Sequence, residues 1–200
     1  MFDNQLIEDA LSHLSRTDSS MNKLILEYPR PKLQKPLNEF EFLVKTIISQ
    51  QLSLKAAQSL ITKFNTLFGF NLSPNAMLDF NLENIGLSTA KIRTIRELSE
   101  ALQTETLNFS QFPNMTDSEV IKALTKLWGI GNWTAHIFMI FGLGRINVFP
   151  EDDLGIKKAL AINYQNPSYS KIKQIQKLWD PYRSIASYYL WQSLQNSLDV

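Results

Sequence analysis

The chain has 200 residues, of which 44% are hydrophobic and 20% charged, and its formal net charge is +1 at pH 7. These values are ordinary for a globular protein of one large domain, or of two small ones that share a core. The absence of cysteine excludes disulfides, cysteine nucleophiles, Cys-ligated zinc and iron–sulfur clusters. The only two histidines, His13 and His136, are too few for an ordinary His-rich zinc site.

The sequence carries no sign of membrane insertion or export. Its apolar runs are too short and too interrupted to cross a bilayer, and its N-terminus is acidic and amphipathic, unlike a secretory signal. We therefore expect a cytoplasmic protein without a membrane partner. Residues 1–120 carry 11 Lys and Arg against 14 Asp and Glu, whereas residues 121–200 carry 9 against 5. This basic excess weakly favours an anionic partner such as nucleic acid.

The hydrophobic pattern predicts an all-α fold. Apolar residues recur at three- and four-residue spacing through most of the chain, and no segment shows a sustained alternation or a short hairpin signal typical of strands. In chain order, a first helix is expected over about 4–16 and a second, containing Met21, Leu24 and Ile25, leads into Tyr28. Further helices are expected over about 38–49, 53–68, 71–78, 88–102, 116–127 and 132–141, then from a cap at 152 or 153 to about 162, from 168 or 170 onward, and from 180–181 to about 195.

Several helix starts carry recognisable capping residues. Asn38 and Ser53 are good N-caps, and Pro74 suits the first turn of a short helix. Thr116 and Glu119 have the spacing of a capping box.

A glycine-containing turn links two of the predicted helices. Gly129 and Gly131 permit a positive φ and a close backbone approach by another molecule. The N–H groups of Gly131, Asn132 and Thr134 lie at the start of the second helix, where they lack intrahelical partners and can bind a phosphate. The alternative is an ordinary helical hairpin whose glycines only make the turn.

A second informative stretch is the acidic run Pro150–Leu154. Its carboxylates precede a predicted helix, so the simplest interpretation is helix capping by Asp152 or Asp153. One carboxylate would then cap the helix while its neighbour remains available; Asp152 would serve better as the cap, although the two could exchange roles. A carboxylate at a helix N-terminus suits the stabilisation of a nearby cation better than the donation of a proton.

Together the two stretches resemble the helix-hairpin-helix DNA glycosylase superfamily. The run 127–135 (LWGIGNWTA) followed by Asp153 resembles the superfamily's Gly-x-Gly hairpin and essential aspartate. The closest likeness is to the 3-methyladenine DNA glycosylase II branch, which removes alkylated bases. The runs 42–53 and 181–191 look like its DNA-intercalating loop and its C-terminal helix.

The resemblance implies a fold and a domain organisation. We expect one glycosylase unit over residues 1–200, built as a two-lobed helical bundle with an active-site cleft between the lobes. The approximate lobes are 38–115, with the wedge loop, and 1–37 plus 116–200, with the hairpin and the catalytic aspartate.

The resemblance also assigns the chemistry. Asp153 is the expected essential carboxylate, which stabilises oxocarbenium-like charge on the sugar and can orient or deprotonate the attacking water. Trp133 stands where lyase members carry a Schiff-base lysine, so this chain resembles the single-function enzymes that leave an abasic site. Trp133 and Trp191 are expected to hold a flipped, electron-poor purine. Core packing is the alternative for both, in the case of Trp191 together with Tyr188 and Tyr189.

The remaining expected sites contact DNA or an ion. Gln51 and Leu52 form the candidate wedge that fills the gap left by the flipped base; the alternative is a helix connector with a buried Leu52. The hairpin backbone from Gly129 to Thr134 would bind phosphates. The resemblance requires no cofactor, although the backbone carbonyls of Thr125, Leu127 and Ile130 are expected to hold a structural potassium or sodium ion.

The sequence thus predicts a monomeric, monofunctional DNA glycosylase of base excision repair, acting on alkylated purines such as 3-methyladenine in double-stranded DNA. Two departures put the range of lesions in doubt. Trp128 stands where the family often has proline, and Leu154 stands where it has tyrosine. The alternatives are a glycosylase for another lesion, a non-catalytic module that binds damaged DNA, and a helical interaction protein without a DNA role.

Overall fold

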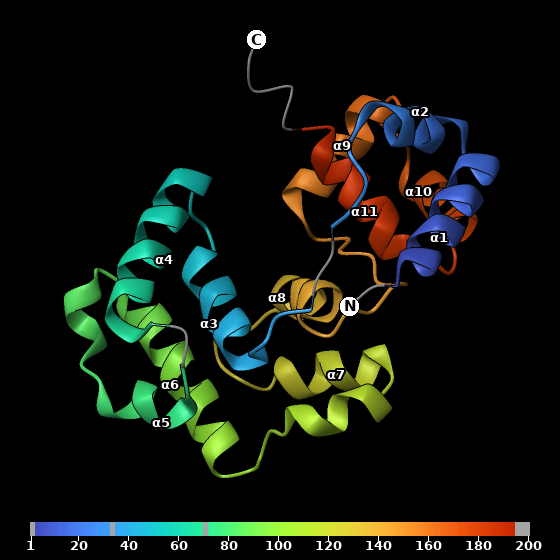
Figure 1. Ribbon diagram of the computed structural model, residues 1–200. Coiled ribbons are helices and arrows are strands. Elements are labelled where there is room, and N and C mark those ends of the chain that lie inside the picture. Colours follow the sequence, from blue (N-terminus) through green and yellow to red (C-terminus); the bar gives the residue numbers. More distant parts are fainter. Residues whose placement is uncertain (1–2, 33–34, 70–71, 195–200) are drawn as a thin grey trace. The chain divides into compact units, whose positions relative to one another are not determined.

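The computed structural model describes residues 3–32, 35–69 and 72–194, and within these ranges every regular element is helical (Figure 1). This confirms the predicted all-α class. The α-helices are α1 (Asn4–Thr17), α2 (Ser19–Glu27), α3 (Glu39–Ser49), α4 (Leu54–Phe68), α5 (Pro74–Asp79), α6 (Thr89–Gln103), α7 (Asp117–Leu124), α8 (Asn132–Ile137), α9 (Leu154–Asn163), α10 (Tyr169–Leu178) and α11 (Arg183–Gln192). Short 3-10 helices, η1 (Leu82–Ile85) and η2 (Phe109–Asn114), and a π-helix, η3 (Phe138–Gly142), complete the list.

The chain separates into two compact units. One unit, here called the outer unit, comprises residues 1–35 and 139–200; the other, here called the central unit, comprises residues 36–138. The first boundary lies close to the expected one at 37. The second lies at residue 138 instead of 115, because α7 and α8 pack on each other and α8 packs on α3, which joins the hairpin to the central unit.

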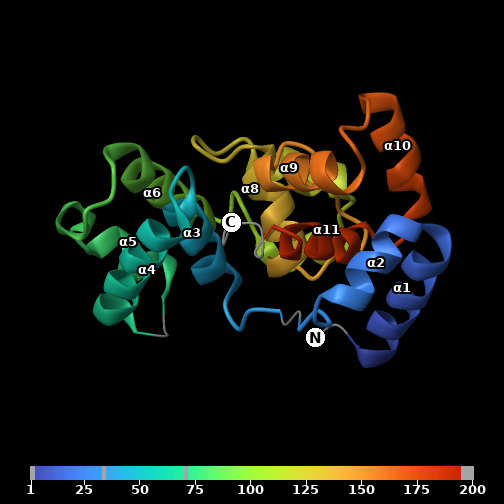
Figure 2. The same ribbon diagram turned by 90° about the horizontal axis from the view of Figure 1, so that it is seen from above.

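The central unit is built around α3. The apolar side chains on the inward face of α3 are fully or almost fully buried. This helix packs against α4, α6 and α8, and α5 packs against α6 (Figure 2). The buried residues of α3 include the predicted inward face: Phe40, Leu43, Val44, Ile47 and Ile48.

The outer unit joins α1 and α2 to α9, α10 and α11. Its core surrounds the fully buried rings of Trp179 and Tyr189, and α11 packs against α1, α2 and α9. Asp18, between α1 and α2, accepts hydrogen bonds from the Tyr164 hydroxyl at 2.8 Å and from Trp179 Nε1 at 2.9 Å. Burial and the neighbouring Asp18 carboxylate raise the pKa of Tyr164, so this hydroxyl stays a donor.

Most predicted helix starts are confirmed. Asn38, Ser53 and Ser88 cap α3, α4 and α6, and Thr116 forms the predicted capping box with Glu119 at α7. The hydrogen bonds that the Glu119 carboxylate accepts from the backbone N–H and the hydroxyl of Thr116 hold its pKa below the ordinary value.

Several element boundaries differ from expectation, including the start of α5, which is at Pro74. The helix α7 ends at Leu124, three residues early, because the chain turns there toward Gly129. The helix after the hairpin changes from α to π geometry at Phe138, and α11 begins at Arg183, beyond the expected start at Asp180 and Pro181.

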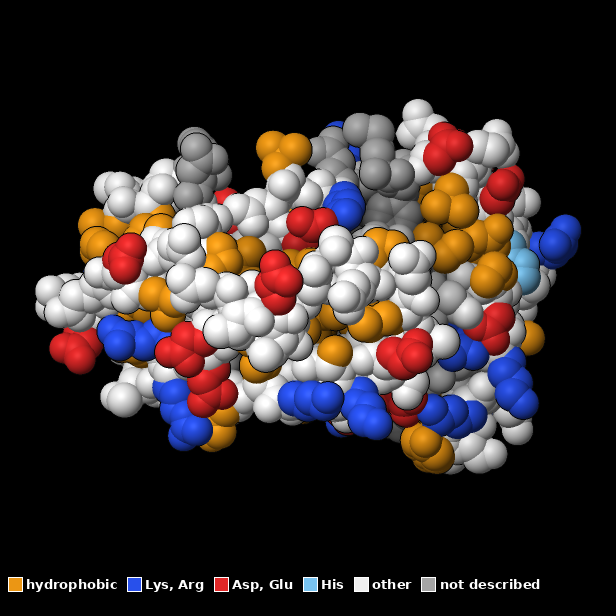
Figure 3. Space-filling view, turned by 90° about the horizontal axis from the view of Figure 1, so that it is seen from below, with side chains coloured by type: hydrophobic (Ala, Val, Ile, Leu, Met, Phe, Trp, Pro, Cys, Tyr) orange, Lys and Arg blue, Asp and Glu red, His pale blue; other side chains and the backbone are white. Residues whose placement is uncertain are grey.

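Within the described ranges, no helix is both long and apolar enough to cross a membrane. On the face shown in Figure 3, lysine and arginine side chains are interspersed with acidic ones. The charge pattern of this face therefore does not by itself mark a docking surface for an anion.

Candidate functional site

Asp153 lies at the N-terminus of α9 and is only 9% exposed to solvent. Its Oδ1 atom accepts the backbone N–H of Ile156 at 2.8 Å and the indole N–H of Trp191 at 3.0 Å. The turn before it is closed by the Asp153 N–H, which donates to the carbonyl of Pro150 at 3.0 Å. Two N–H donors and the positive end of a helix dipole therefore stabilise negative charge on this side chain.

Of the two arrangements that the sequence left open, the structure has Asp153 as the cap, so the preference for Asp152 as the cap is wrong. Asp152 is exposed, whereas Asp153 is both the helix cap and the carboxylate bonded to Trp191. The physical reason is the tight turn from Pro150, which places Asp153 at the N-cap position. Glu151, the third acid of the run, pairs with Lys173 at 2.6 Å between Oε1 and Nζ.

The indole of Trp191 is fixed on several sides. Its ring lies 5.6 Å from that of Phe141, centroid to centroid, with an interplanar angle of 35°. A Cβ atom on Gly155 would lie 3.0 Å from Asp153 Oδ1 and 3.3 Å from Trp191 Cδ1. Glycine at this position therefore lets the carboxylate and the indole approach the start of α9 closely.

The hairpin turn belongs to the central unit and joins α7 to α8. Gly129 has a φ of +79°, and a Cβ there would lie 2.1 Å from Thr94 Oγ1, so the fold requires glycine at this position. Gly131 differs from expectation, since it is extended, with a φ of −98°. A Cβ at Gly131 would meet no atom within 4 Å, so the packing of the fold does not require glycine there.

The start of α8 lacks a side-chain cap. Nine of the eleven described α-helices have such a cap, and the exceptions are α8 and α11. Gly131 and Asn132 are exposed at this end, Trp133 is half-buried, and Thr134 is buried. Backbone donors at an exposed, uncapped end of this kind can bind a phosphate.

The candidate wedge lies between α3 and α4. Gln51, at the tip, is exposed and has a φ of +56°, which is rare for a residue with a side chain. Leu52 is 37% exposed, so it is not the buried residue of a simple helix connector. The neighbouring Gln50 is half-buried and points back to the hairpin, where its Nε2 lies 3.1 Å from the carbonyl oxygen of Gly129.

The predicted ion ligands lie together in the turn after α7. Thr125 is the C-cap of α7, and the carbonyl oxygen of Leu127 accepts the N–H of Ile130 at 3.2 Å, leaving its second lone pair in place. Backbone carbonyls are the kind of oxygen donor that hard cations take, so the donor set fits potassium or sodium. In the described chain, no cluster of three or more His, Asp or Glu side chains is arranged to hold a metal ion.

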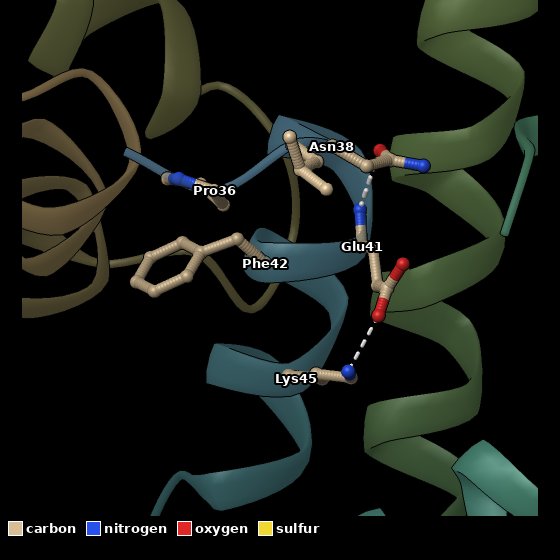
Figure 4. A pocket seen from close by; sticks show the side chains of 6 residues that line it. Pro36, Asn38, Glu41, Phe42 and Lys45 are labelled. Atoms are coloured by element: carbon tan, nitrogen blue, oxygen red, sulfur yellow. Dashed lines mark hydrogen bonds and ion pairs between the residues drawn. The ribbon is translucent and has the colours of Figure 1, made fainter. Parts of the chain in front are cut away.

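A pocket of 290 Å³ opens beside the first turns of α3. Figure 4 shows Phe42 on one side of this helix and Glu41, bonded to Lys45, on the other. Phe42 packs near Phe138, with ring centroids 6.3 Å apart, so the pocket has an aromatic wall next to the end of α8.

Three residues of these clusters were not predicted from the sequence. Two of them could have been found from the local sequence: Gln50 adjoins the wedge tip, and Gly155 is a poor helix former in the first turn of a helix. Phe141 carries none, because its contact with Trp191 depends on the packing of distant segments. Of the predicted site residues, Asp153 and Trp191 lie in the outer unit and are in contact with each other. Trp133 lies in the central unit.

Comparison with known proteins gives a consistent result. The pattern of the HhH-GPD superfamily of base excision DNA repair proteins matches residues 44–183. The alkylbase DNA glycosidase-like protein Mag2 of Schizosaccharomyces pombe is 30% identical over 92% of this chain and 92% of its own length. DNA-3-methyladenine glycosylase 1 of the same organism is 28% identical over 90% of this chain and 85% of its own.

Solved structures agree. The S. pombe 3-methyladenine DNA glycosylase Mag1, in complex with abasic DNA, aligns with a TM-score of 0.83 at 27% identity, covering 94% of this chain and 97% of that one. A DNA-3-methyladenine glycosidase from Bacillus halodurans aligns with a TM-score of 0.80 at 29% identity, covering 95% and 91%. With its all-helical fold and the matched hairpin and aspartate region, the chain belongs to the HhH-GPD superfamily of base excision DNA repair proteins.

Proposed function

We propose that the protein is a monofunctional DNA glycosylase that releases alkylated purines, such as 3-methyladenine, from double-stranded DNA and leaves an abasic site. The observation that carries the proposal is the carboxylate of Asp153, held at the start of α9 by Ile156 and Trp191 in a chain of this family. Relatives along most of the chain are named as alkylbase or 3-methyladenine glycosylases.

The chemistry follows from the charge of the leaving group. Cleavage of the N-glycosidic bond sends the bonding electrons to the base and leaves oxocarbenium-like positive charge on the sugar. An alkylated purine is already cationic, so it departs as a neutral base without a strong general acid. The ionised Asp153 stabilises the sugar cation, and it can accept a proton as water forms the new bond to C1′.

The residue at position 133, near the start of α8, determines whether the DNA strand is cleaved after base release. Trp133 cannot form the Schiff base that a lysine forms at this position in lyase members, so the DNA strand stays intact. We assign Trp133 and Trp191 to the binding of the flipped purine, where an aromatic face attracts a cationic ring by about 0.5–2 kcal/mol. The edge of Trp191 is in addition a donor to Asp153, so this residue serves both base and carboxylate.

DNA is the proposed macromolecular partner, and the protein is proposed to act as a monomer. The hairpin from Gly129 to Thr134 supplies backbone N–H groups for phosphates. The open space beside Gly131 supports close approach by a phosphate, because the fold does not require glycine there. The Gln51–Leu52 tip fills the gap left by the flipped nucleotide, and its exposure and strained backbone are consistent with this use.

A monovalent cation is proposed at the carbonyls of Thr125, Leu127 and Ile130. When bound, such an ion supplies positive charge for a DNA phosphate next to the hairpin. The chemistry of base release takes no step through it.

The proposal is tested by base release from methylated duplex DNA incubated with the purified protein, analysing both the freed base and the strand. Release of 3-methyladenine, with strands that break only after alkali, is the expected result. Release of uracil, hypoxanthine or an oxidised purine instead would replace the alkylpurine assignment. Strand breakage without alkali would contradict the monofunctional assignment, and binding without release of any base would indicate a non-catalytic module.

A further inference from the structure

The side chain of Gln50 connects the wedge loop to the hairpin. Its Nε2 lies 3.1 Å from the carbonyl oxygen of Gly129 and 2.9 Å from Oγ1 of Thr134. Because a backbone carbonyl only accepts, the amide nitrogen must face Gly129 and donate. One amide thus donates both to the hairpin turn, at Gly129, and to the first turn of α8, at Thr134.

A second bond holds the same end of α3. Lys91, on α6, donates its Nζ to the carbonyl oxygen of Ile48 at 2.8 Å. Burial lowers the pKa of the Lys91 ammonium below its ordinary value. The last turn of α3 is therefore tied on one side to α6 and on the other to the hairpin.

The tip follows directly from this anchored turn. Gln51, with its φ of +56°, is the next residue, and the N–H of Leu52 donates to the Ser49 carbonyl oxygen at 3.3 Å. Ser53 then caps α4. The exposed part of the loop therefore consists only of Gln51, Leu52 and the cap residue Ser53, and it directly follows the anchored Gln50.

We infer that Gln50 is a positioning residue that couples the wedge to the hairpin, so that docking of the hairpin on the DNA backbone places the Gln51–Leu52 tip for insertion into the duplex. This inference rests on the proposed function. It assigns Gln50 to base flipping and gap filling, without contact with the scissile bond. Coupling of this kind matters because unpairing and unstacking a base costs a few kcal/mol that insertion must offset.

The chemistry of the link requires an amide of this length. Glutamate at position 50 has the same size but would place carboxylate oxygens against the Gly129 carbonyl, so it cannot donate. Alanine removes both bonds. Gln50→Glu therefore tests hydrogen bonding without creating a cavity, and Gln50→Ala tests the whole side chain. Gln58→Ala, on the exposed side of α4, is the matched control.

The first experiment compares single-turnover base release from two duplexes, in which the lesion is opposite either thymine or an abasic-site analogue. On the paired substrate, Gln50→Ala and Gln50→Glu should be slower than wild type by about tenfold or more, since a misplaced group of this kind can cost a hundredfold. Opposite an abasic site the base is already unpaired, so the deficit should shrink severalfold. An equal deficit on both substrates would overturn the inference, as would a wild-type rate.

A second experiment does not depend on base release. A duplex holds a tetrahydrofuran abasic-site analogue with 2-aminopurine opposite it, and the fluorescence reports insertion of the tip. Wild type and Gln58→Ala should change the fluorescence, whereas the Gln50 variants should bind but change it much less. For the Gln50 variants, the slope of log Kd against the logarithm of the salt concentration should match that of wild type, because the phosphate contacts are retained. A normal fluorescence change would overturn the inference even if no base is released by any variant.

Thr134→Val provides an independent variant that removes only one of the two bonds. If Gln50 acts through the hairpin, the effects of Thr134→Val and Gln50→Ala on insertion should be less than additive in the double variant. Full additivity would contradict a shared path. Circular dichroism melts keep the test interpretable, since the Gln50 deficit must be present at a temperature where every variant is folded.

If wild type releases no base from the paired substrate, the proposed function fails, and the fluorescence experiment still decides the role of Gln50. If wild type releases base and the Gln50 variants match it in both experiments, only the coupling fails.

Discussion

At the scale of single residues, Asp153 owes its position to contacts on two sides. The N–H of Ile156 fixes Oδ1 from the helix, and the indole of Trp191 fixes the same atom from α11. Gly155 makes room for both, since a side chain there would press on the carboxylate and the indole. The cap of α9 and the proposed catalytic group are thus one side chain.

This arrangement predicts a specific effect of Trp191→Phe. The variant keeps an aromatic ring against Phe141 but loses the donor to Asp153, and a hydrogen bond to a charged group contributes about 1.5–3 kcal/mol. We expect kcat for release of a methylated purine to fall about 10- to 100-fold, with a much smaller change in KM. Tyr169→Phe, on the exposed surface of α10, should leave both constants unchanged. A rise in KM with kcat unchanged would indicate that Trp191 only binds the base and does not act through Asp153.

The two hairpin glycines allow a matched pair of variants. Gly129→Ala places a methyl group against Thr94 in a backbone with positive φ, so it should destabilise the fold by about 1–3 kcal/mol. Gly131→Ala meets no protein atom, so its melting temperature should stay near that of wild type while its affinity for abasic DNA falls. The measurements are thermal melts and fluorescence anisotropy. Unchanged DNA binding by Gly131→Ala would remove the hairpin from the proposed interface.

At the scale of secondary-structure elements, one buried carboxylate joins four helices or their flanking turns. Asp18 caps α2 through the N–H groups of Ser20 and Met21 and also accepts from Tyr164 and Trp179. Removal of its side chain leaves buried donors without an acceptor, which is more costly than loss of a cap alone.

We therefore predict that Asp18→Ala lowers the free energy of unfolding by about 3 kcal/mol or more, measured by urea denaturation. Asp3→Ala is the control, because Asp3 is an exposed cap of α1 whose side chain accepts the N–H of Gln5 at 3.3 Å. Its loss should cost about 0.5–1 kcal/mol. Equal losses in the two variants would show that the buried network contributes no more than an ordinary cap.

The capping residues explain why helix starts were predictable from the sequence. Ser, Thr, Asp and Asn bond the first backbone N–H groups locally, so Asn38, Ser53 and Thr116 mark their helices without knowledge of the tertiary structure. Helix ends and unusual geometry were less predictable. The change to π geometry at Phe138 and the short η1 and η2 depend on packing or are too short for periodicity to detect.

At the scale of the whole molecule, the residues with proposed roles are distributed over the two units. The hairpin and wedge belong to residues 36–138, and Asp153 with Trp191 belongs to the unit formed by residues 1–35 and 139–200. The sequence indicated the hairpin and the aspartate because both lie in short local motifs. It did not indicate the bonds of Gln50 to Gly129 and Thr134, since these join residues about eighty positions apart.

The most direct test of the proposed function is Asp153→Asn. An asparagine keeps an oxygen that accepts from Ile156 and Trp191 and is itself a good helix cap, so fold and affinity for abasic DNA should remain. Only the negative charge is lost. We expect the rate of 3-methyladenine release from methylated duplex DNA to fall by about a hundredfold or more. Release at the wild-type rate, by a variant that folds and binds DNA normally, would contradict the role of the Asp153 carboxylate as the stabiliser of the sugar cation.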